Sequence, residues 1–176
     1  MSILGVPVEL PSSIVDGNPS LEETKKLLEI AIGLRVRSVF EIGTGNGSTV
    51  LALASVSTIE QLWTLDLPAG ITTKWPLLES DLRWLNLPKP DFPDKITQLW
   101  GDSATFEGPY RGACDLVFVM GSHSRKYILN DIALARRFVS KNGIVVWHGG
   151  TPTPMELVAA EHRLLRLGDR MAVIWK

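Results

Sequence analysis

The stretch FEIGTGNGST at residues 40–49 carries the most chemical information, because glycines alternate with polar residues directly after an apolar run. The glycines are Gly43, Gly45 and Gly47, and Glu41 stands two residues before the first of them. Glycine has no Cβ, so such a turn lets the backbone come close to a bound molecule. In an open parallel sheet, ligands bind at the ends of strands. We therefore expect a ligand at this turn, rather than a plain glycine-rich turn.

Two aspartates stand at corresponding places after later apolar runs. Asp66 belongs to the run at 62–67, 19 residues after Gly47. A carboxylate there can accept two hydrogen bonds from a ribose diol, as acids do in nucleotide-binding folds, or it is a surface acid at a strand end. Asp102 closes the run at 95–102 and either contacts a ligand or caps a helical turn.

Two histidines also stand near predicted strand ends and could do acid–base chemistry. His123 follows the apolar run at 114–121, and His148 lies in the run at 143–149. An unperturbed imidazole titrates near pH 6.5, so either could act as a general base on an acceptor hydroxyl. A histidine at a strand end can equally hydrogen-bond the backbone or cap a helix. Both roles remain open for each residue.

The elements that must position these residues alternate along the chain. Strands are predicted at 36–43, 62–67, 95–102, 114–121 and 143–149, and RLLRLGDRMAVIWK at 163–176 reads as a hairpin. Helices are predicted around 19–33, where Ser20 and Glu23 form a capping box, and at 48–56, 124–143 and 155–162. Alternating strands and helices indicate a parallel sheet covered on both faces. We predict a doubly wound, Rossmann-like α/β fold with a mainly parallel, seven-stranded sheet and a C-terminal antiparallel hairpin.

A long proline-containing interval joins the second and third predicted strands, from Leu67 to Lys95. Within it, residues 72–87 show helical spacing of apolar residues, namely Trp75, Leu78, Leu82 and Leu85. This stripe indicates either core packing or a cover over a ligand site, since long connections in compact domains are often functional.

Composition and charge limit the classes of function. The 176 residues suggest one domain over 1–176, with an N-terminal segment and helix at 1–35 and the sheet core at 36–176. A formal net charge of −1 argues against general nucleic-acid or membrane-surface binding. A single cysteine, Cys114, and the absence of a signal-peptide pattern favour the cytoplasm.

The segment EIGTGNGS resembles the first motif of class I S-adenosylmethionine-dependent methyltransferases, E/D-x-G-x-G-x-G. A dehydrogenase-type dinucleotide site fits less well, because the third glycine of G-x-G-x-x-G would come one residue later. Residues 114–150 are similar to a branch of small O-methyltransferase-like proteins, and GVPVELPSS at 5–13 resembles that branch's leading segment.

This resemblance implies S-adenosylmethionine as the cofactor. The glycine turn would meet its ammonium and carboxylate, Asp66 its ribose and Asp102 its adenine amino group. The implied cofactor contacts are Glu41, Gly43, Thr44, Gly45, Gly47, Ser48, Asp66, Asp102, Ser103 and Met120.

Two positions depart from the pattern of this branch. Met120 stands where an aspartate follows the fourth strand, and Gly149 stands where an aspartate follows the WH pair. In metal-dependent relatives, acids at these strand ends hold a divalent cation. Mg²⁺ and Ca²⁺ require oxygen ligands, which a thioether and a glycine side chain do not supply. We therefore expect no such metal at this site, with His123 and His148 as the candidate catalytic residues.

The resemblance thus implies a metal-independent methyltransferase that acts on an oxygen of a small-molecule acceptor. The alternative is a non-catalytic module that binds S-adenosylmethionine and has lost its catalytic acids. Short relatives often pair, so a homodimer is also a hypothesis, and neither a nucleic acid nor a membrane is expected as a partner.

Overall fold

The structure is a computed structural model that describes residues 7–11, 19–85, 87–88, 90–149, 156, 158–160 and 162–174. Its helices are α1 (Leu21–Gly33), α2 (Ser48–Ala54), α3 (Glu79–Leu82) and α4 (Arg125–Phe138). Its strands are β1 (Ser38–Ile42), β2 (Gln61–Asp66), β3 (Ile96–Trp100), β4 (Cys114–Val119), β5 (Val139–His148), β6 (Leu164–Arg166) and β7 (Met171–Ile174).

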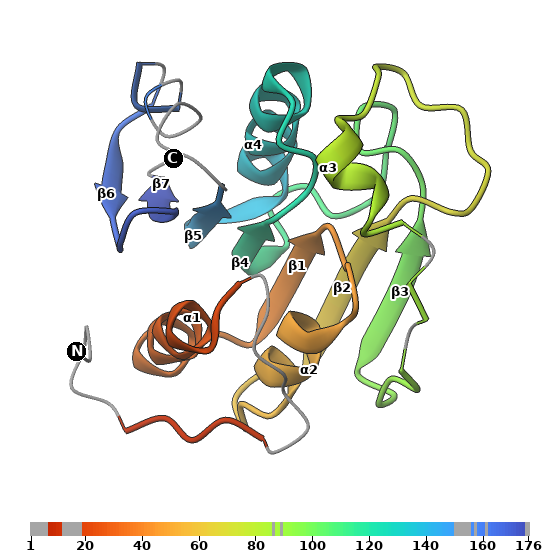
Figure 1. The fold of residues 1–176 in the computed structure, drawn as a ribbon. Coiled ribbons are helices and arrows are strands. Elements are labelled where there is room, and N and C mark those ends of the chain that lie inside the picture. Colours follow the sequence, from red (N-terminus) through yellow and green to blue (C-terminus); the bar gives the residue numbers. More distant parts are fainter. Residues whose placement is uncertain are drawn as a thin grey trace.

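The strands within these ranges form one seven-stranded sheet in the order β3-β2-β1-β4-β5-β7-β6. The pairs from β3 through β5 are parallel, whereas β7 runs antiparallel to both β5 and β6. The strand order reverses between β1 and β4, which is where doubly wound sheets bind ligands. The predicted fold class, including its C-terminal hairpin, is confirmed (Figure 1).

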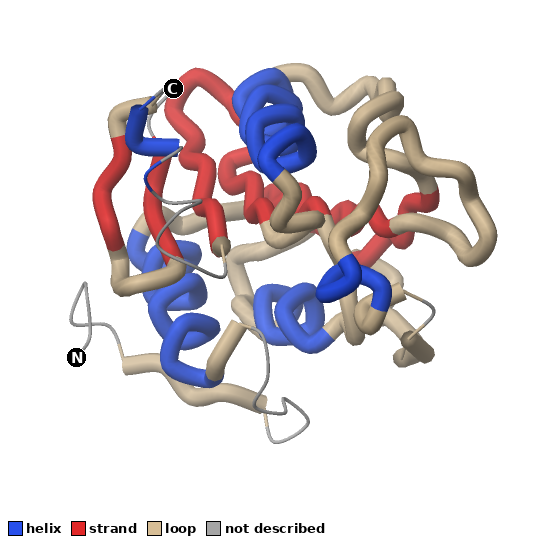
Figure 2. Tube along the Cα trace, turned by 45° about the horizontal axis from the view of Figure 1, so that its top comes forward, coloured by secondary structure: helices blue, strands red, loops and turns tan. Residues whose placement is uncertain are grey.

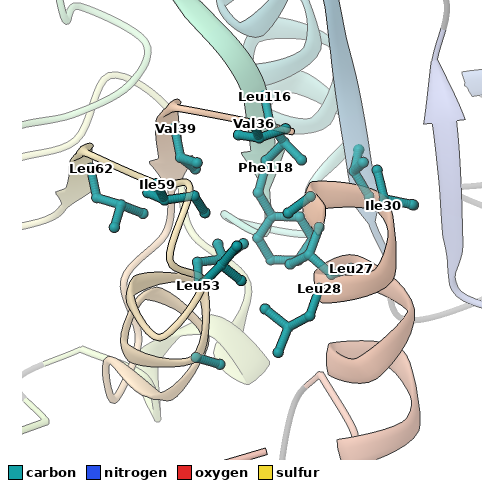
Figure 3. Packing of buried hydrophobic residues seen from close by; sticks show 14 of the residues in the cluster. Leu27, Leu28, Ile30, Val36, Val39, Leu53, Ile59, Leu62, Leu116 and Phe118 are labelled. Atoms are coloured by element: carbon teal, nitrogen blue, oxygen red, sulfur yellow. The ribbon is translucent and has the colours of Figure 1, made fainter. Parts of the chain in front are cut away.

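Helices cover both faces of the sheet because each buried strand alternates its side chains between them. Val39 of β1 packs under α1 and α2, whereas its neighbour Phe40 packs under α4. Figure 2 shows the sheet lying between α4 and the pair formed by α1 and α2. In the first of these cores, Leu27 of α1 and Leu53 of α2 lie against Phe118 of β4 (Figure 3).

Helix α1 begins where its sequence predicts. The Ser20 side chain accepts a hydrogen bond from the Glu23 N–H at 3.3 Å, and the Ser20 N–H donates to Glu23 Oε2 at 2.9 Å. This capping box satisfies backbone donors at the helix start, as predicted.

Two element boundaries differ from their predictions. The helix expected over 72–87 is reduced to α3, because Pro76 lacks an N–H and biases Trp75 away from helical backbone. Helix α4 ends at Phe138, before the predicted stop at Lys141 to Gly143, because the buried Val139 pairs with Cys114 and already belongs to β5.

Some predictions lie partly outside the described residues, including the segment at 5–13, of which 7–11 are described, and the helix at 155–162, of which 156 and 158–160 are helical. Among the residues that the structure describes, no helix is long and apolar enough to cross a membrane.

Candidate functional site

A cavity that is partly open to solvent lies at the C-terminal ends of β1 to β4. Seven of the residues predicted to be functional line it, namely Gly43, Gly45, Asp66, Asp102, Ser103, Met120 and His123. The fold therefore brings together the glycine turn and both aspartates that the sequence placed at later strand ends.

The glycine turn after β1 has left-handed backbone, and the surroundings of Gly43 and Gly45 differ sharply. Gly43 has φ +95°, and a Cβ there would collide with the Met120 carbonyl group. Gly45 has φ +54°, and a Cβ there would meet no atom of the described residues within 4 Å. Gly43 thus permits close packing of two turns, whereas Gly45 leaves open space at the cavity wall that a bound molecule could fill.

A chain of polar side chains supports the turn from beneath. Gln98 of β3 donates a hydrogen bond to Thr44 Oγ1 at 3.2 Å, and the hydroxyl groups of Thr44 and Thr64 are 2.7 Å apart. Thr64 in turn donates to the fully buried Glu41 carboxylate at 2.5 Å. Since Thr64 has one proton to donate, the Thr44 hydroxyl must donate to Thr64. Every bond of the chain therefore points toward Glu41.

This network explains why some predicted contacts do not line the cavity. Glu41 and Thr44 are buried within the network, and Gly47 and Ser48 start α2. None of these four residues is among those that line the cavity. The supporting partners Thr64 and Gln98 were missed, because a threonine and a glutamine within apolar strands carry no motif signal of their own.

Asp66 and Asp102 stand at the ends of β2 and β3 along the cavity wall. Asp66 Oδ1 accepts a hydrogen bond from the Leu67 N–H at 3.0 Å. Asp102 also holds its own turn, since its carboxylate accepts from the N–H groups of Ala104, at 2.9 Å, and Lys74, at 2.7 Å. The capping role foreseen for Asp102 is therefore present, together with its position at the cavity.

Helix α4 adds two cavity residues that the sequence did not reveal as functional. The Tyr127 hydroxyl donates to Asp102 Oδ2 at 3.0 Å, and burial, followed by contact with Asp102, raises the pKa of Tyr127 to about 12. Burial raises the pKa of Asp131 to about 7, although a hydrogen bond with Ser103 opposes that shift. Asp131 also lies so close to Gly121 that a Cβ there would be 2.5 Å from its carboxylate.

The cavity wall is acidic as well as apolar. Four aspartates line it, Asp66, Asp81, Asp102 and Asp131, and no lysine or arginine stands among the described lining residues. Such a wall favours a ligand that carries positive charge.

Residues 73–85 form a cover segment over the cavity, with Leu77, Trp84 and Leu85 among its lining residues. The Trp75 ring packs edge-on against Tyr127, with centroids 5.3 Å apart. Of the predicted apolar stripe, Leu78 is 41% exposed and Leu82 53% exposed. The stripe is therefore not core packing, and the alternative of a cover over the site agrees with the structure.

The two candidate catalytic histidines lie in different places. His123 lines the cavity beside Asp81 of α3, whose carboxylate also accepts a hydrogen bond from Ser122 at 2.5 Å. His148 is buried outside the cavity lining, with Nε2 3.3 Å from Glu23 Oε2 of α1. The sequence missed Asp81, because it lies inside the long interval after Leu67, where no strand end marks it.

The two positions of the missing acids do not form a cation site. Met120 is among the residues that line the cavity and packs against the core under α1 and α2, and a Cβ at Gly149 would collide with the Trp147 indole. Nowhere in the described ranges do three histidine, cysteine, aspartate or glutamate residues group so as to hold a metal ion. The side chains at positions 120 and 149 therefore supply no oxygen ligand of the kind that Mg²⁺ or Ca²⁺ requires.

Comparison with known proteins assigns a family to this arrangement. A family described as a methyltransferase domain matches residues 40–149, which is more than half of the chain. No curated protein sequence matches the chain significantly.

Several solved structures share the fold. Methyltransferase PaMTH1 of Podospora anserina, with S-adenosylhomocysteine (SAH) bound, matches with a TM-score of 0.57 and 15% identity over 88% of this chain and 78% of that chain. The N-methyltransferase NodS of Bradyrhizobium japonicum WM9 matches with a TM-score of 0.56 and 13% identity, over 87% of this chain and 92% of that chain. A Klebsiella pneumoniae protein provisionally assigned as an O-methyltransferase matches with a TM-score of 0.56 and 16% identity, over 94% of this chain and 83% of that chain. At these identities the likeness concerns the fold, and the ligand of PaMTH1 agrees with the cofactor predicted here.

Proposed function

This chain belongs to the methyltransferase-domain family, and we propose that it transfers a methyl group from S-adenosylmethionine to an oxygen of a small molecule without a metal ion. The observation that carries this proposal is the cavity at the ends of β1 to β4, which gathers Gly43, Gly45, Asp66 and Asp102 into one wall. The acidic wall also suits the cofactor, whose sulfonium and ammonium groups are cationic.

The residues of this wall fit the parts of the cofactor. The open space beside Gly45 suits the methionine end, Asp66 suits the ribose diol, and Asp102 and Ser103 suit the adenine. When bound, S-adenosylmethionine supplies an activated methyl group on sulfur. The chain then has to align the acceptor and keep water out. Alignment of this kind can lower the barrier by up to about 7–11 kcal/mol in well-oriented reactions.

His123 is the candidate general base, because it lines the cavity with the glycine turn. His148 was the second candidate, and its contact with Glu23 instead favours a role in joining α1 to β5. The metal-independent part of the proposal rests on Met120 and on the collision that a side chain at Gly149 would have with Trp147.

A second function deserves a test, because the same two positions lack the acids of metal-dependent relatives. A protein that binds S-adenosylmethionine without turnover would keep the cavity and would need no base. Binding and transfer therefore have to be measured separately.

Calorimetry with S-adenosylmethionine and SAH tests the cofactor. Dissociation constants below 1 mM, which correspond to binding free energies more favourable than about −4 kcal/mol, support the cofactor assignment. Weaker binding of both compounds would refute it. Incubation with methyl-labelled cofactor and a metabolite extract then tests transfer. Label recovered in small molecules supports an enzyme, whereas tight binding with no labelled product supports the non-catalytic module.

We further propose that the protein acts in the cytoplasm as a single domain that binds small molecules. The only cysteine, Cys114, is buried, and burial raises the pKa of its thiol to about 12, which agrees with an inert residue in a reducing compartment. Self-association into a homodimer is a separate hypothesis that analytical ultracentrifugation would test.

A further inference from the structure

The turn after β4 lies against α3 of the cover segment through one carboxylate. Asp81 Oδ2 accepts hydrogen bonds from Ser122 Oγ at 2.5 Å and from the Leu78 N–H at 3.0 Å. Asp81 Oδ1 accepts from the His123 N–H at 3.4 Å and lies 3.7 Å from His123 Nδ1. Only 8% of Asp81 is exposed, so these contacts form a nearly enclosed site.

The contacts define which oxygen and nitrogen atoms can carry a proton. Burial acts to raise the pKa of Asp81, but hydrogen bonds from His123, Ser122 and the Leu78 N–H lower it below its usual range. Asp81 is therefore an ionised carboxylate, which only accepts hydrogen bonds. An imidazole nitrogen that faces it is favoured in its N–H form, so Nδ1 of His123 holds the proton and Nε2 keeps a lone pair.

The other nitrogen of His123 is left with unused hydrogen-bonding capacity. Nε2 is buried and has no hydrogen-bond partner among the described residues, while His123 lines the cavity with Gly43 and Gly45. A buried acceptor without a donor is costly, so a ligand that donates to it gains affinity at this point. A hydroxyl group is such a donor, and it becomes a good nucleophile only when a base takes its proton.

We propose that Asp81 is a positioning residue that fixes His123 with Nε2 as the base, and that the methyl acceptor presents an alcohol or phenol hydroxyl to this nitrogen. This inference rests on the proposed function and specifies its acceptor. In the transfer step, the hydroxyl proton passes to Nε2 while the acceptor oxygen forms a bond to the methyl carbon. The carbon–sulfur bond breaks, its electron pair stays on sulfur to give neutral SAH, and His123 later releases the proton to solvent.

The tautomer of His123 provides a test that does not depend on turnover. The chain has three histidines, so long-range ¹⁵N NMR of histidine-labelled protein at pH 8, assigned with His123→Gln and His162→Gln, can resolve each ring. We expect the Nδ1–H form for His123 in the native chain, a mixture of tautomers in Asp81→Asn, and recovery of the native form in Asp81→Glu. A native His123 in the Nε2–H form would overturn the proposal.

Glu79→Gln is the matched control, since Glu79 is an exposed acid two residues away on the same helix. It should leave the His123 signals unchanged. SAH binding, measured by calorimetry on every variant, reports whether the cofactor site and the fold survive. If SAH fails to bind the native chain, the proposed function fails, while the tautomer result still decides the role of Asp81.

The acceptor class is tested with phenol and aniline, which differ in the donor atom. Added to the SAH complex, phenol should shift the Nε2 resonance of His123, and aniline should shift it less. With labelled cofactor, phenol should be methylated faster than aniline, and Asp81→Asn should lower kcat at least about tenfold with a smaller change in KM. Faster methylation of aniline, or an equal loss in Glu79→Gln, would contradict the proposal.

Discussion

Gly43 and Gly45 share one turn, yet a methyl group added at each would meet different surroundings. At Gly43 it would collide with the Met120 backbone, which cannot move away easily, because the Met120 N–H bonds to the Ile42 carbonyl at 2.8 Å. At Gly45 it would enter open space at the cavity. The fold therefore constrains the residue type at Gly43, and we expect the proposed ligand to constrain it at Gly45.

We expect Gly43→Ala to destabilise the protein by more than about 2 kcal/mol, because left-handed strain adds to a backbone clash. Gly45→Ala should cost about 1 kcal/mol, from strain alone, and should weaken SAH binding at least tenfold by filling the cavity wall. Thermal unfolding and calorimetry measure the two effects. Equal loss of stability in both variants would contradict this account.

Asp131 makes stability depend on pH. Its pKa is raised to about 7 in the folded protein, above the usual value of 3.8, so the folded state holds a proton that the unfolded state has already released. Stability should therefore fall between about pH 4 and pH 7, by a few kcal/mol at most. Asp131→Asn cannot ionise, so it should be more stable than the native chain at pH 8 and similar at pH 4.

Urea unfolding of both proteins at pH 4, 6 and 8 measures this difference. Asp91→Asn serves as the control, because Asp91 is exposed. A stability gain of Asp131→Asn that does not vary with pH would show that packing, and not ionisation, causes it.

At the scale of the elements, Glu23 joins the start of α1 to two strands. Arg170, next to β7, donates to Glu23 Oε2 at 2.8 Å, and His148 at the end of β5 lies 3.3 Å away. Burial acts to raise the pKa of Glu23, but hydrogen bonds from His148, Ser20 and Arg170 lower it well below its usual range. A lowered pKa means that the carboxylate stabilises the fold above about pH 4.5, and that this contribution is lost as pH falls toward the folded value.

Glu23→Gln should therefore destabilise the protein at pH 7 by about 1–3 kcal/mol, since it weakens the hydrogen bonds from the Arg170 guanidinium and removes the charge beside the buried His148 imidazole. Glu22→Gln should have little effect, because Glu22 is exposed and forms an i,i+4 ion pair with Lys26 on the surface of the same helix. Thermal unfolding at pH 7 compares them. A difference between the two variants that persists below pH 3 would contradict the ionic explanation.

Sequence reasoning identified the strands better than the connections between them. The buried strands were predictable because continuous apolar runs such as LVFV of β4 favour parallel sheets. The start of β5 was not predictable, because the helical spacing of apolar residues continued past Phe138. The start of the strand is set by the pairing between Val139 and Cys114.

The candidate site was predictable to a similar extent. Residues at strand ends, such as Asp66 and Asp102, could be placed from topology alone. Asp81 and Asp131 could not be placed in this way. Asp81 comes from a long connection and Asp131 from a helix face, and the packing of both depends on tertiary contacts. His148 was expected above the cavity, but its side chain meets Glu23 of α1.

At the scale of the whole molecule, ligand binding should appear as stability. A saturating ligand at 100 times its dissociation constant adds about 2.7 kcal/mol, which corresponds to a rise in Tm of roughly 5–11 °C for a chain of this size. We expect SAH to produce such a rise, and EDTA to leave both the rise and any methyl transfer unchanged. A loss of transfer in EDTA that Mg²⁺ restores would refute metal independence.

The atoms nearest to a Cβ at Gly43 are main-chain atoms, namely the carbonyl oxygen and carbon of Met120 and the Cα of Gly121. The residue type at position 120 can therefore diverge without loosening the turn that supports the candidate cofactor site. At a strand end of this kind, the side chain can change while the backbone of the neighbouring turn keeps its position.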